Sequence, residues 1–222
     1  MSGEKSMNRD FWQVESLRYT ESHFRLEKCA HIINSLSKNR GCDLLDVGCG
    51  PATIAKLLQK NIHYYGIDLV IHAPAPNLLE MDIRQNEIGF NGRMFDIVFM
   101  QGVFEYLGDH QHKKLGEIHH VLKQGGKFIV TYVNFNHFRS LLLDNSIYNN
   151  IQPIEVFKGD LESFFIIDKS FPTSYNWNRT EPRRGWLKKI QMPLHVRLPV
   201  LSTYLAVEYI FICSPRKEES LD

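Results

Sequence analysis

The sequence predicts an α/β protein with a doubly wound, mostly parallel β-sheet and helices on both faces. Three observations carry this prediction: apolar segments of strand length recur between residues 42 and 134, helical patterns or loops separate them, and the first ends in a glycine-rich turn. Strands that alternate with helices favour parallel pairing through right-handed crossovers. We therefore expect a single domain that spans residues 1–222.

The first 135 residues divide into a helical start and a core. Residues 1–40 are predicted to be an N-terminal helical segment, because Phe24, Ile33 and Leu36 recur near helical spacing. Within the core, residues 41–135, five segments are predicted strands: CDLLDVG, IHYYGID, NLLEMDI, FDIVFMQGVF and KFIVTYVN. Two more are predicted helices: ATIAKLL, which follows the first strand, and HQHKKLGEIHHVLKQGG, with Gly125 and Gly126 as its stop.

The pattern changes over residues 136–222. NHFRSLLLDN is a candidate helix, and FFIIDKSFPTSY and TYLAVEYIFICS are predicted strands. The stretch between these two strands is dense in Pro, Arg, Lys and Trp and has no clear period. We expect this part of the chain to supply insertions that cover a substrate, together with the last strands of the sheet.

Composition excludes several classes of protein. A formal net charge of +1 gives no polycation for nucleic acid, and no apolar run is long enough for stable insertion into a membrane. The four cysteines show no C-x-x-C spacing, and the N-terminus has no apolar signal core. Together these features predict reduced thiols and a cytoplasmic location.

The stretch LLDVGCGPATIAKLL, residues 44–58, joins the first predicted strand to a predicted helix. Gly48 and Gly50 lie at the corner, where small residues let backbone N–H groups and a helix N-terminus face a ligand. A dinucleotide-binding loop would carry a third glycine, but Thr53 stands at that position. The corner predicts a ligand site at the carboxyl end of the strand.

Two acidic residues narrow the choice of ligand. Asp46 lies just before the glycines, where a carboxylate would repel a pyrophosphate but suits a cationic amino-acid end. Asp68 closes the second strand, where a carboxylate can accept hydrogen bonds from both hydroxyls of a ribose. A ligand with a ribose and an ammonium group but no phosphate is S-adenosylmethionine, which we predict as the cofactor.

The same motifs resemble those of class I S-adenosylmethionine-dependent methyltransferases. After the glycine corner, the resemblance continues in order through YYGIDLV, MDIRQ, FDIVFMQGVFEYLGD and VLKQGGKFIVTYVN, and so covers about residues 44 to 134. It implies a Rossmann-like sheet of seven strands whose seventh strand is antiparallel. It also implies that residues 41–135 are the cofactor-binding core.

The resemblance assigns a role to each cofactor-binding candidate. It places the methionine part over Gly48, Cys49, Gly50 and Pro51, with its ammonium near Asp46, the ribose at Asp68, and the adenine against Leu69, Asp82 and Ile83. Gln101, Gly102 and Phe104 would line the site near the sulfonium. Arg18 and Tyr19 resemble a pair that covers the methionine carboxylate, with ordinary helix-surface residues as the alternative.

The end of the fourth predicted strand bears on the acceptor. It reads QGVFEY and lacks the Asn/Asp-Pro-Pro-aromatic motif of DNA and amide N-methyltransferases, so a nucleic-acid substrate is not expected. The sequence resembles small-molecule O-methyltransferases, which implies a small-molecule acceptor that is methylated on oxygen in biosynthetic or secondary metabolism. Some such enzymes hold a metal through a Glu-His pair, which Glu105 and Tyr106 replace in this sequence, so no metal is predicted.

Three residues are candidates for a catalytic base. His137 follows the fifth predicted strand, Glu105 follows the fourth, and His110 lies in the loop beyond it. Acceptor specificity is expected in residues 138–203, where the basic 179–189 segment could bind an anionic acceptor or membrane surface or be a solvated loop.

Two other functions stay open at this stage. A methyltransferase-fold protein could bind the cofactor without turnover, and an NAD-dependent oxidoreductase could share the doubly wound sheet. The sequence does not identify the acceptor or the oligomeric state.

Overall fold

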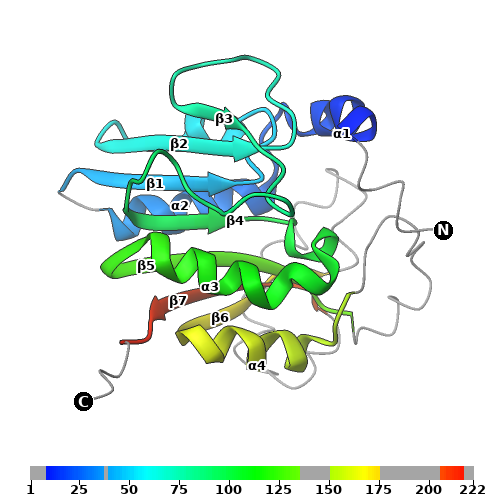
Figure 1. Cartoon of the computed structure of the whole chain (residues 1–222), viewed down its shortest axis with the longest axis vertical. Coiled ribbons are helices and arrows are strands. Elements are labelled where there is room, and N and C mark those ends of the chain that lie inside the picture. The colour runs from blue at the N-terminus through cyan, green and yellow to red at the C-terminus, as the bar shows by residue number, and fades with distance from the viewer. Residues whose placement is uncertain (1–8, 38–39, 136–150, 176–205, 218–222) are drawn as a thin grey trace.

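The structure, a computed structural model, describes residues 9–37, 40–135, 151–175 and 206–217. In these ranges, seven strands form one sheet in the order β3-β2-β1-β4-β5-β7-β6 (Figure 1). Their bounds are β1 Cys42–Val47, β2 Ile62–Asp68, β3 Leu78–Glu80, β4 Phe95–Met100, β5 Leu122–Val133, β6 Phe165–Tyr175 and β7 Ala206–Pro215. All seven correspond to predicted strands, and residues 136–150, which hold the candidate helix, lie outside the described part.

The direction of the strands decides where a ligand site can form. The pairs β1–β2, β1–β4, β2–β3 and β4–β5 are parallel, whereas β7 is antiparallel to both β5 and β6. The predicted fold class is therefore confirmed, including its antiparallel strand. The carboxyl ends of the parallel strands meet along one side of the sheet, the carboxyl edge, and β7 begins there because its direction is reversed (Figure 1).

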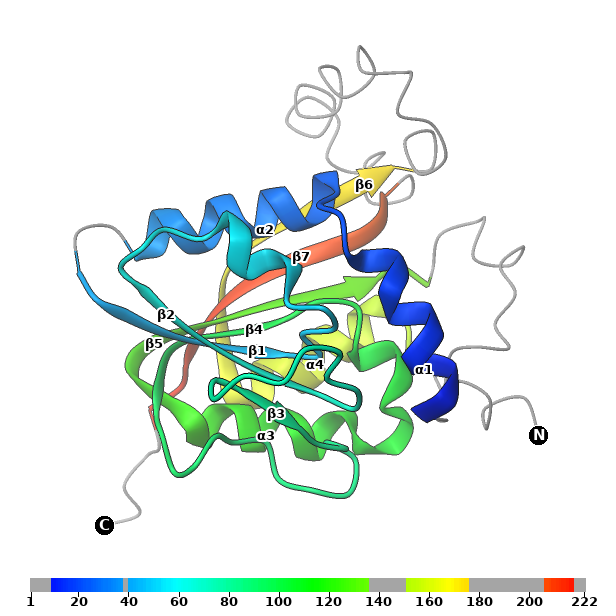
Figure 2. The same cartoon turned by 90° about the horizontal axis from the view of Figure 1, so that it is seen from above.

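Helices cover both faces of the sheet (Figure 2). Helix α2 lies on one face, whereas α3 and α4 lie on the other, and α1 lies beside the carboxyl edge (Figures 1 and 2). The helical elements are α1 Arg9–Glu15, η2 Ser16–Tyr19, α2 Phe24–Leu36, η3 Thr53–Leu57, η4 Phe104–Tyr106, η5 Gly108–His110, α3 Gln111–Val121 and α4 Ile154–Phe164.

Two hydrophobic cores hold these layers together. Successive side chains of a strand point to opposite faces, so Leu45 and Val47 of β1 enter the core with α3 and α4, whereas Cys42 and Leu44 enter the core with α2. Both faces of β1 are buried, which explains its nearly continuous apolar sequence.

Two predicted helix boundaries are wrong. ATIAKLL forms only the short 3₁₀ segment η3, because Ala52 is left-handed with φ +53° and Leu58 is already extended. The glycine corner therefore has no α-helix N-terminus, and its own N–H groups are already engaged: those of Gly48 and Cys49 donate to the Ile67 carbonyl, and that of Gly50 donates to Asp68 Oδ2. Helix α3 ends at Val121, and Gly125 and Gly126 lie within β5 and do not form its stop.

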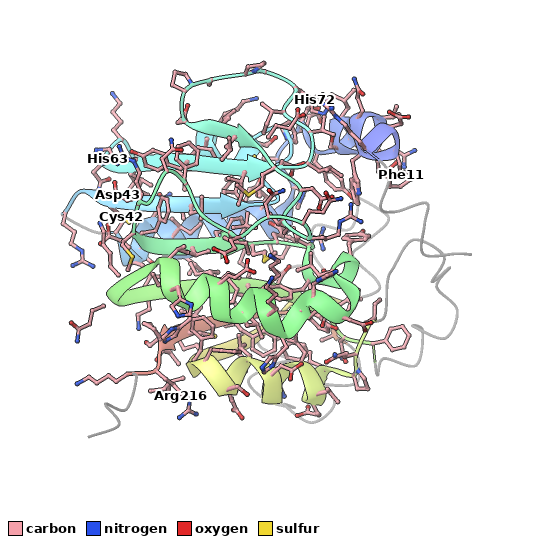
Figure 3. The ribbon with its side chains drawn as sticks, viewed as in Figure 1. Phe11, Cys42, Asp43, His63, His72 and Arg216 are labelled. Atoms are coloured by element: carbon pink, nitrogen blue, oxygen red, sulfur yellow. The ribbon has the colours of Figure 1, made fainter. Side chains whose placement is uncertain are left out.

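Ion pairs connect the strands at the end of the sheet opposite the carboxyl edge. Lys123 Nζ lies 3.0 Å from Asp43 Oδ2 and 2.9 Å from Asp96 Oδ2, while Asp43 Oδ1 is 3.1 Å from His63 Nδ1. Figure 3 shows Asp43 and His63 at the end of the sheet away from His72 and α1. These ion pairs link the strands at the end of the sheet opposite the carboxyl edge, and we look for the ligand site at the carboxyl edge.

Candidate active site

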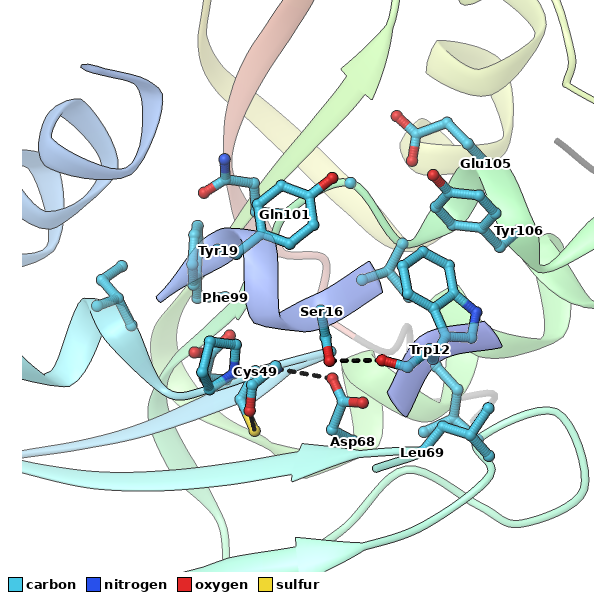
Figure 4. A pocket seen from close by; sticks show the side chains of 18 of the residues that line it. Trp12, Ser16, Tyr19, Cys49, Asp68, Leu69, Phe99, Gln101, Glu105 and Tyr106 are labelled. Atoms are coloured by element: carbon cyan, nitrogen blue, oxygen red, sulfur yellow. Dashed lines mark hydrogen bonds between the residues drawn. The ribbon is translucent and has the colours of Figure 1, made fainter. Parts of the chain in front are cut away.

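A pocket of about 250 Å³ opens at the carboxyl edge (Figure 4). Its lining comes from the ends of β1, β2, β4 and β5, the start of β7, and the N-terminal helices. The predicted residues in the lining are Tyr19, Asp46, Gly48, Cys49, Gly50, Pro51, Asp68, Leu69, Asp82, Ile83, Gln101, Gly102 and Glu105. Sequence-distant segments thus converge on one cavity.

The two positions of the corner require glycine for different structural reasons. Gly48 has φ +79°, and a Cβ added there would lie 2.3 Å from Val103 Cγ2, closer than packing allows. Gly50 has φ +51°, but an added Cβ would meet no atom within 4 Å. Gly48 therefore allows the loop after β4 to pack against the corner, whereas Gly50 keeps open the space above it.

Replacing Gly48 with alanine should lower the free energy of unfolding by about 2–5 kcal/mol, through a left-handed backbone and a clash with Val103. Urea denaturation measures this loss. The matched control is Gly50→Ala, which shares the left-handed backbone but has free space, and should lose only about 1–2 kcal/mol. Equal losses in the two variants would contradict the assigned role of Val103.

Asp46 is a buried carboxyl at the end of β1. It is 3% exposed, and Tyr64 Oη donates a hydrogen bond of 2.7 Å to its Oδ2. Burial, opposed by the Tyr64 hydrogen bond and helped by the charge of Asp68, raises the pKa of Asp46 to about 7. The carboxyl is therefore poised to ionise when a cation enters the pocket.

This raised pKa predicts a pH-dependent stability. The folded state retains the Asp46 proton between roughly pH 4 and 7, where the unfolded chain has lost it, so the stability that Asp46 contributes falls as pH rises. Asp46→Asn cannot ionise and keeps an acceptor for Tyr64. The difference in free energy of unfolding between Asp46→Asn and the wild type, measured by urea denaturation, should shift in favour of the variant by on the order of 2–4 kcal/mol from pH 5 to pH 8. A pH-independent difference would contradict this.

Asp68 joins the second strand to the glycine corner. Its Oδ2 accepts a hydrogen bond of 2.7 Å from the Gly50 N–H, and its Oδ1 accepts one of 3.0 Å from the Val70 N–H. Burial raises the pKa of Asp68, and these backbone donors counteract part of the shift. Because a carboxylate oxygen can accept more than one hydrogen bond, both oxygens retain capacity for ligand hydroxyls.

The lining beyond β3 differs from expectation in one respect. Asp82 faces the pocket, but Arg84 holds its carboxylate in a fork, with Nε 2.8 Å from Oδ1 and Nη2 2.7 Å from Oδ2. Arg84 also lowers the pKa of Asp82. Leu69, Met81 and Ile83 supply apolar surface beside this ion pair.

The far side of the pocket contains a second carboxyl with a raised pKa. Glu105 is 3% exposed, and its Oε1 accepts a hydrogen bond of 3.0 Å from the Val133 N–H. Its Oε2 has no partner among the described residues, as is also true of Gln101 Oε1. Burial raises the pKa of Glu105 to about 7, helped by the charge of Glu208. Glu208 in turn pairs with Arg25 at 2.8 Å.

The N-terminal helices contribute to the pocket lining through Trp12, Ser16 and Tyr19 (Figure 4). The carbonyl of Tyr19 accepts a hydrogen bond of 2.6 Å from Thr53 Oγ1. Arg18 does not share this placement: its side chain is 73% exposed and pairs with Glu15. The structure therefore brings Tyr19 to the pocket and leaves Arg18 at the surface.

Two further expectations differ from the observed lining, and a third concerns a residue that the structure does not describe. Phe104 is fully buried in the core with Phe128 and Phe157, and Val103 lines the pocket in its place. His110 is exposed and lies outside the lining. His137 lies outside the described residues, so its role as a base stays a prediction.

Sequence reasoning missed Arg25 and Glu208. The available signal was Glu208 itself, a single acid inside the apolar segment TYLAVEYIFICS. The antiparallel register pairs Glu208 with Val133, which brings it to the carboxyl edge beside Glu105. A charged side chain in a buried strand lowers the stability of the fold unless it is paired, and Arg25 is the ion-pair partner of Glu208.

In the described part of the chain, no group of three or more His, Cys, Asp or Glu side chains is arranged to hold a metal ion. The helices described there include none with the length and apolar character needed to cross a membrane. All four cysteines are buried and free of disulfide bonds.

The seven-stranded sheet with its antiparallel β7, and a pocket at the carboxyl edge, agree with the fold expected for a methyltransferase. A family model described as a methyltransferase domain matches residues 22–164, and the chain belongs to this family. The match confirms the resemblance deduced from the sequence, with S-adenosylmethionine as cofactor, and sets aside the oxidoreductase alternative.

One curated relative matches the chain over part of its length. Malonyl-[acyl-carrier protein] O-methyltransferase from Calditerrivibrio nitroreducens is 29% identical over 109 residues, which are 45% of this chain and 43% of that protein. The match thus spans less than half the length of the relative.

Solved structures share the fold across nearly the whole chain. A TehB-like SAM-dependent methyltransferase from Corynebacterium glutamicum has a TM-score of 0.59 and 14% identity, covering 94% of this chain and 100% of that one. N-methyltransferase NodS from Bradyrhizobium japonicum, in complex with S-adenosyl-l-homocysteine, has a TM-score of 0.57 and 13% identity, covering 97% of each chain. At these identities the similarity demonstrates the fold alone.

Proposed function

We propose that the protein transfers the methyl group of S-adenosylmethionine to an oxygen atom of a small-molecule acceptor. The observation that carries this proposal is the convergence of Asp46, Gly50 and Asp68 on one pocket at the carboxyl edge. In open α/β sheets, ligands bind at this edge, outside the carboxyl ends of the strands.

We infer the direction of the cofactor across the carboxyl edge from the strand order. In this proposal the ribose hydroxyls donate to Asp68 at the end of β2, and the adenine lies against Leu69 and Ile83. The amino-acid end lies over the glycine corner, with its ammonium toward Asp46 at the end of β1. The sulfonium then faces Gln101 and the loop beyond β4.

The acceptor would enter from the side of β5 and β7. There the lining carries Glu105, Val133 and the Arg25–Glu208 pair, all beyond the strands that hold the cofactor in this proposal. Residues 136–222 include the segments expected to cover this side, and that assignment stays a prediction. The malonyl-[acyl-carrier protein] O-methyltransferase relative supports oxygen as the methylated atom.

The chemistry is an in-line displacement. The acceptor oxygen forms a bond to the methyl carbon as the carbon–sulfur bond breaks, and a hydroxyl acceptor loses its proton to a base. Glu105 is the base candidate that the structure places at the pocket, with a carboxyl pKa of about 7. A carboxylate acceptor would need no base.

Two measurements test this function. Titration calorimetry should show binding of S-adenosylmethionine and none of NAD. Incubation with S-adenosylmethionine and an acceptor panel, with malonyl-[acyl-carrier protein] and simple phenols and alcohols as members, should form S-adenosylhomocysteine only when an acceptor is methylated. Absence of S-adenosylmethionine binding would overturn the proposal, and binding without transfer across the panel would favour a cofactor-binding protein without turnover.

A further inference from the structure

The charged groups of the pocket do not balance. Both arginines in its lining are paired with acids: Arg25 with Glu208 at 2.8 Å and Arg84 with Asp82 at 2.7 Å. Three more acids line the same cavity, and none of them has an ion-pair partner among the described residues; they are Asp46, Asp68 and Glu105. The lining therefore carries an excess of negative charge when these groups are ionised.

Neutral donors hold these three carboxyls in place. Tyr64 donates a hydroxyl to Asp46, and backbone N–H groups donate to Asp68 and Glu105. Such hydrogen bonds fix the position of a carboxylate but do not cancel its charge. Buried charge without a counter-ion is unfavourable, so a cation that enters the pocket would be stabilised by all three groups.

The donor and the product of methyl transfer differ by one methyl group and one positive charge. S-adenosylmethionine has a cationic sulfonium, whereas S-adenosylhomocysteine has a neutral thioether at the same position. On the basis of the proposed function, we propose that the unpaired carboxyls make the pocket bind the sulfonium donor more tightly than the thioether product, with Glu105 as the main discriminating residue.

The placement of the three groups separates their contributions. In the proposed orientation Asp68 contacts the ribose and Asp46 faces the ammonium, and both ligand parts are present in donor and product alike. Glu105 lies in the loop beyond the end of β4, which the sulfonium faces in the proposed orientation, and its Oε2 has no partner among the residues described. The charge of Glu105 is therefore the one that acts mainly on the group that changes.

The preference should depend on pH, because a protonated carboxyl does not attract a cation. Burial raises the pKa of all three groups, to about 7 for Asp46 and Glu105. Asp46 and Asp68 act on each other, and Cys49 lies near both. The other titratable groups around Asp46 are Tyr64 and Cys29, and the other one around Asp68 is His72. Around Glu105 the charged or titratable groups are Glu208, Arg25 and Tyr132. Preference for the donor should thus grow from pH 6 to pH 8.

The test is titration calorimetry of the full chain with S-adenosylmethionine and S-adenosylhomocysteine at pH 6 and pH 8. For the wild type at pH 8, we expect a dissociation constant about tenfold lower for the donor than for the product, and a smaller ratio at pH 6. Glu105→Gln keeps an acceptor for the Val133 N–H but removes the charge. It should weaken donor binding several-fold at pH 8 and leave product binding unchanged.

The matched control is Glu155→Gln, which removes one negative charge from the surface of α4, where Glu155 pairs with Lys158. It should retain the wild-type ratio. Equal affinity for donor and product at pH 8, or an unchanged ratio in Glu105→Gln, would overturn the inference. The pH dependence of the wild type tests it even if Glu105→Gln fails to fold. Failure of both ligands to bind would instead overturn the proposed function, and this inference with it.

Discussion

Replacing Gly50 with valine is expected to abolish S-adenosylmethionine binding while the sheet stays folded. Gly50 lines the pocket, and a Cβ at this position would meet no protein atom within 4 Å, so the valine side chain would occupy free space above the corner. In the proposed complex the methionine part of the cofactor fills that space. Calorimetry should detect no binding, and circular dichroism should retain the wild-type spectrum.

The backbone of Gly50 requires a control for this experiment. Its φ of +51° is unfavourable for residues with a side chain, and more so for β-branched ones. Gly50→Ala has much of the same backbone penalty with a smaller group, so it should bind the cofactor more weakly than the wild type but detectably. Wild-type affinity in a folded Gly50→Val variant would show that no ligand occupies the space above the corner.

Replacing Asp68 with alanine should weaken S-adenosylmethionine binding by about 1.5–3 kcal/mol, or about 10- to 150-fold, as hydrogen bonds to a charged acceptor are lost. The structure adds a second reason for the loss. Asp68 also accepts the N–H groups of Gly50 and Val70, so its removal loosens the corner on which the cofactor would lie. Calorimetry measures the change in affinity.

Asp68→Asn separates charge from shape. The amide matches the carboxylate in size, but its NH₂ group would face either the Gly50 N–H or the Val70 N–H, and two donors cannot pair. We therefore expect Asp68→Asn to bind nearly as weakly as Asp68→Ala. Unchanged affinity in a folded Asp68→Ala variant would remove Asp68 from the site.

The sequence was most informative where local pattern and chemistry coincide. The strands of the core are continuous apolar segments that end in small or acidic residues, and parallel strands bring such ends to one edge. This is why spacing and family resemblance place Asp46, Gly50 and Asp68 together, as the pocket lining does. The helix expected after the corner failed because Ala52 adopts a left-handed conformation that no pattern indicated.

Residues on distant segments could not be placed in the same way. Arg25 and Glu208 meet only because β7 is antiparallel and α2 packs beside it, and pairing across 183 residues has no local signature. Phe104 and Val103 illustrate a smaller limit, since both follow β4, and only the turn of η4 decides which one enters the core. The exposure of Arg18 likewise follows from the orientation of η2.

A crystal structure of the protein with S-adenosylhomocysteine would show whether the cofactor occupies the pocket. We expect the nucleoside across the carboxyl edge, with its ribose hydroxyls within hydrogen-bond distance of the Asp68 carboxylate and its amino-acid end over Gly48–Gly50. Density for the ligand elsewhere on the molecule, or an empty pocket at a saturating ligand concentration, would contradict it.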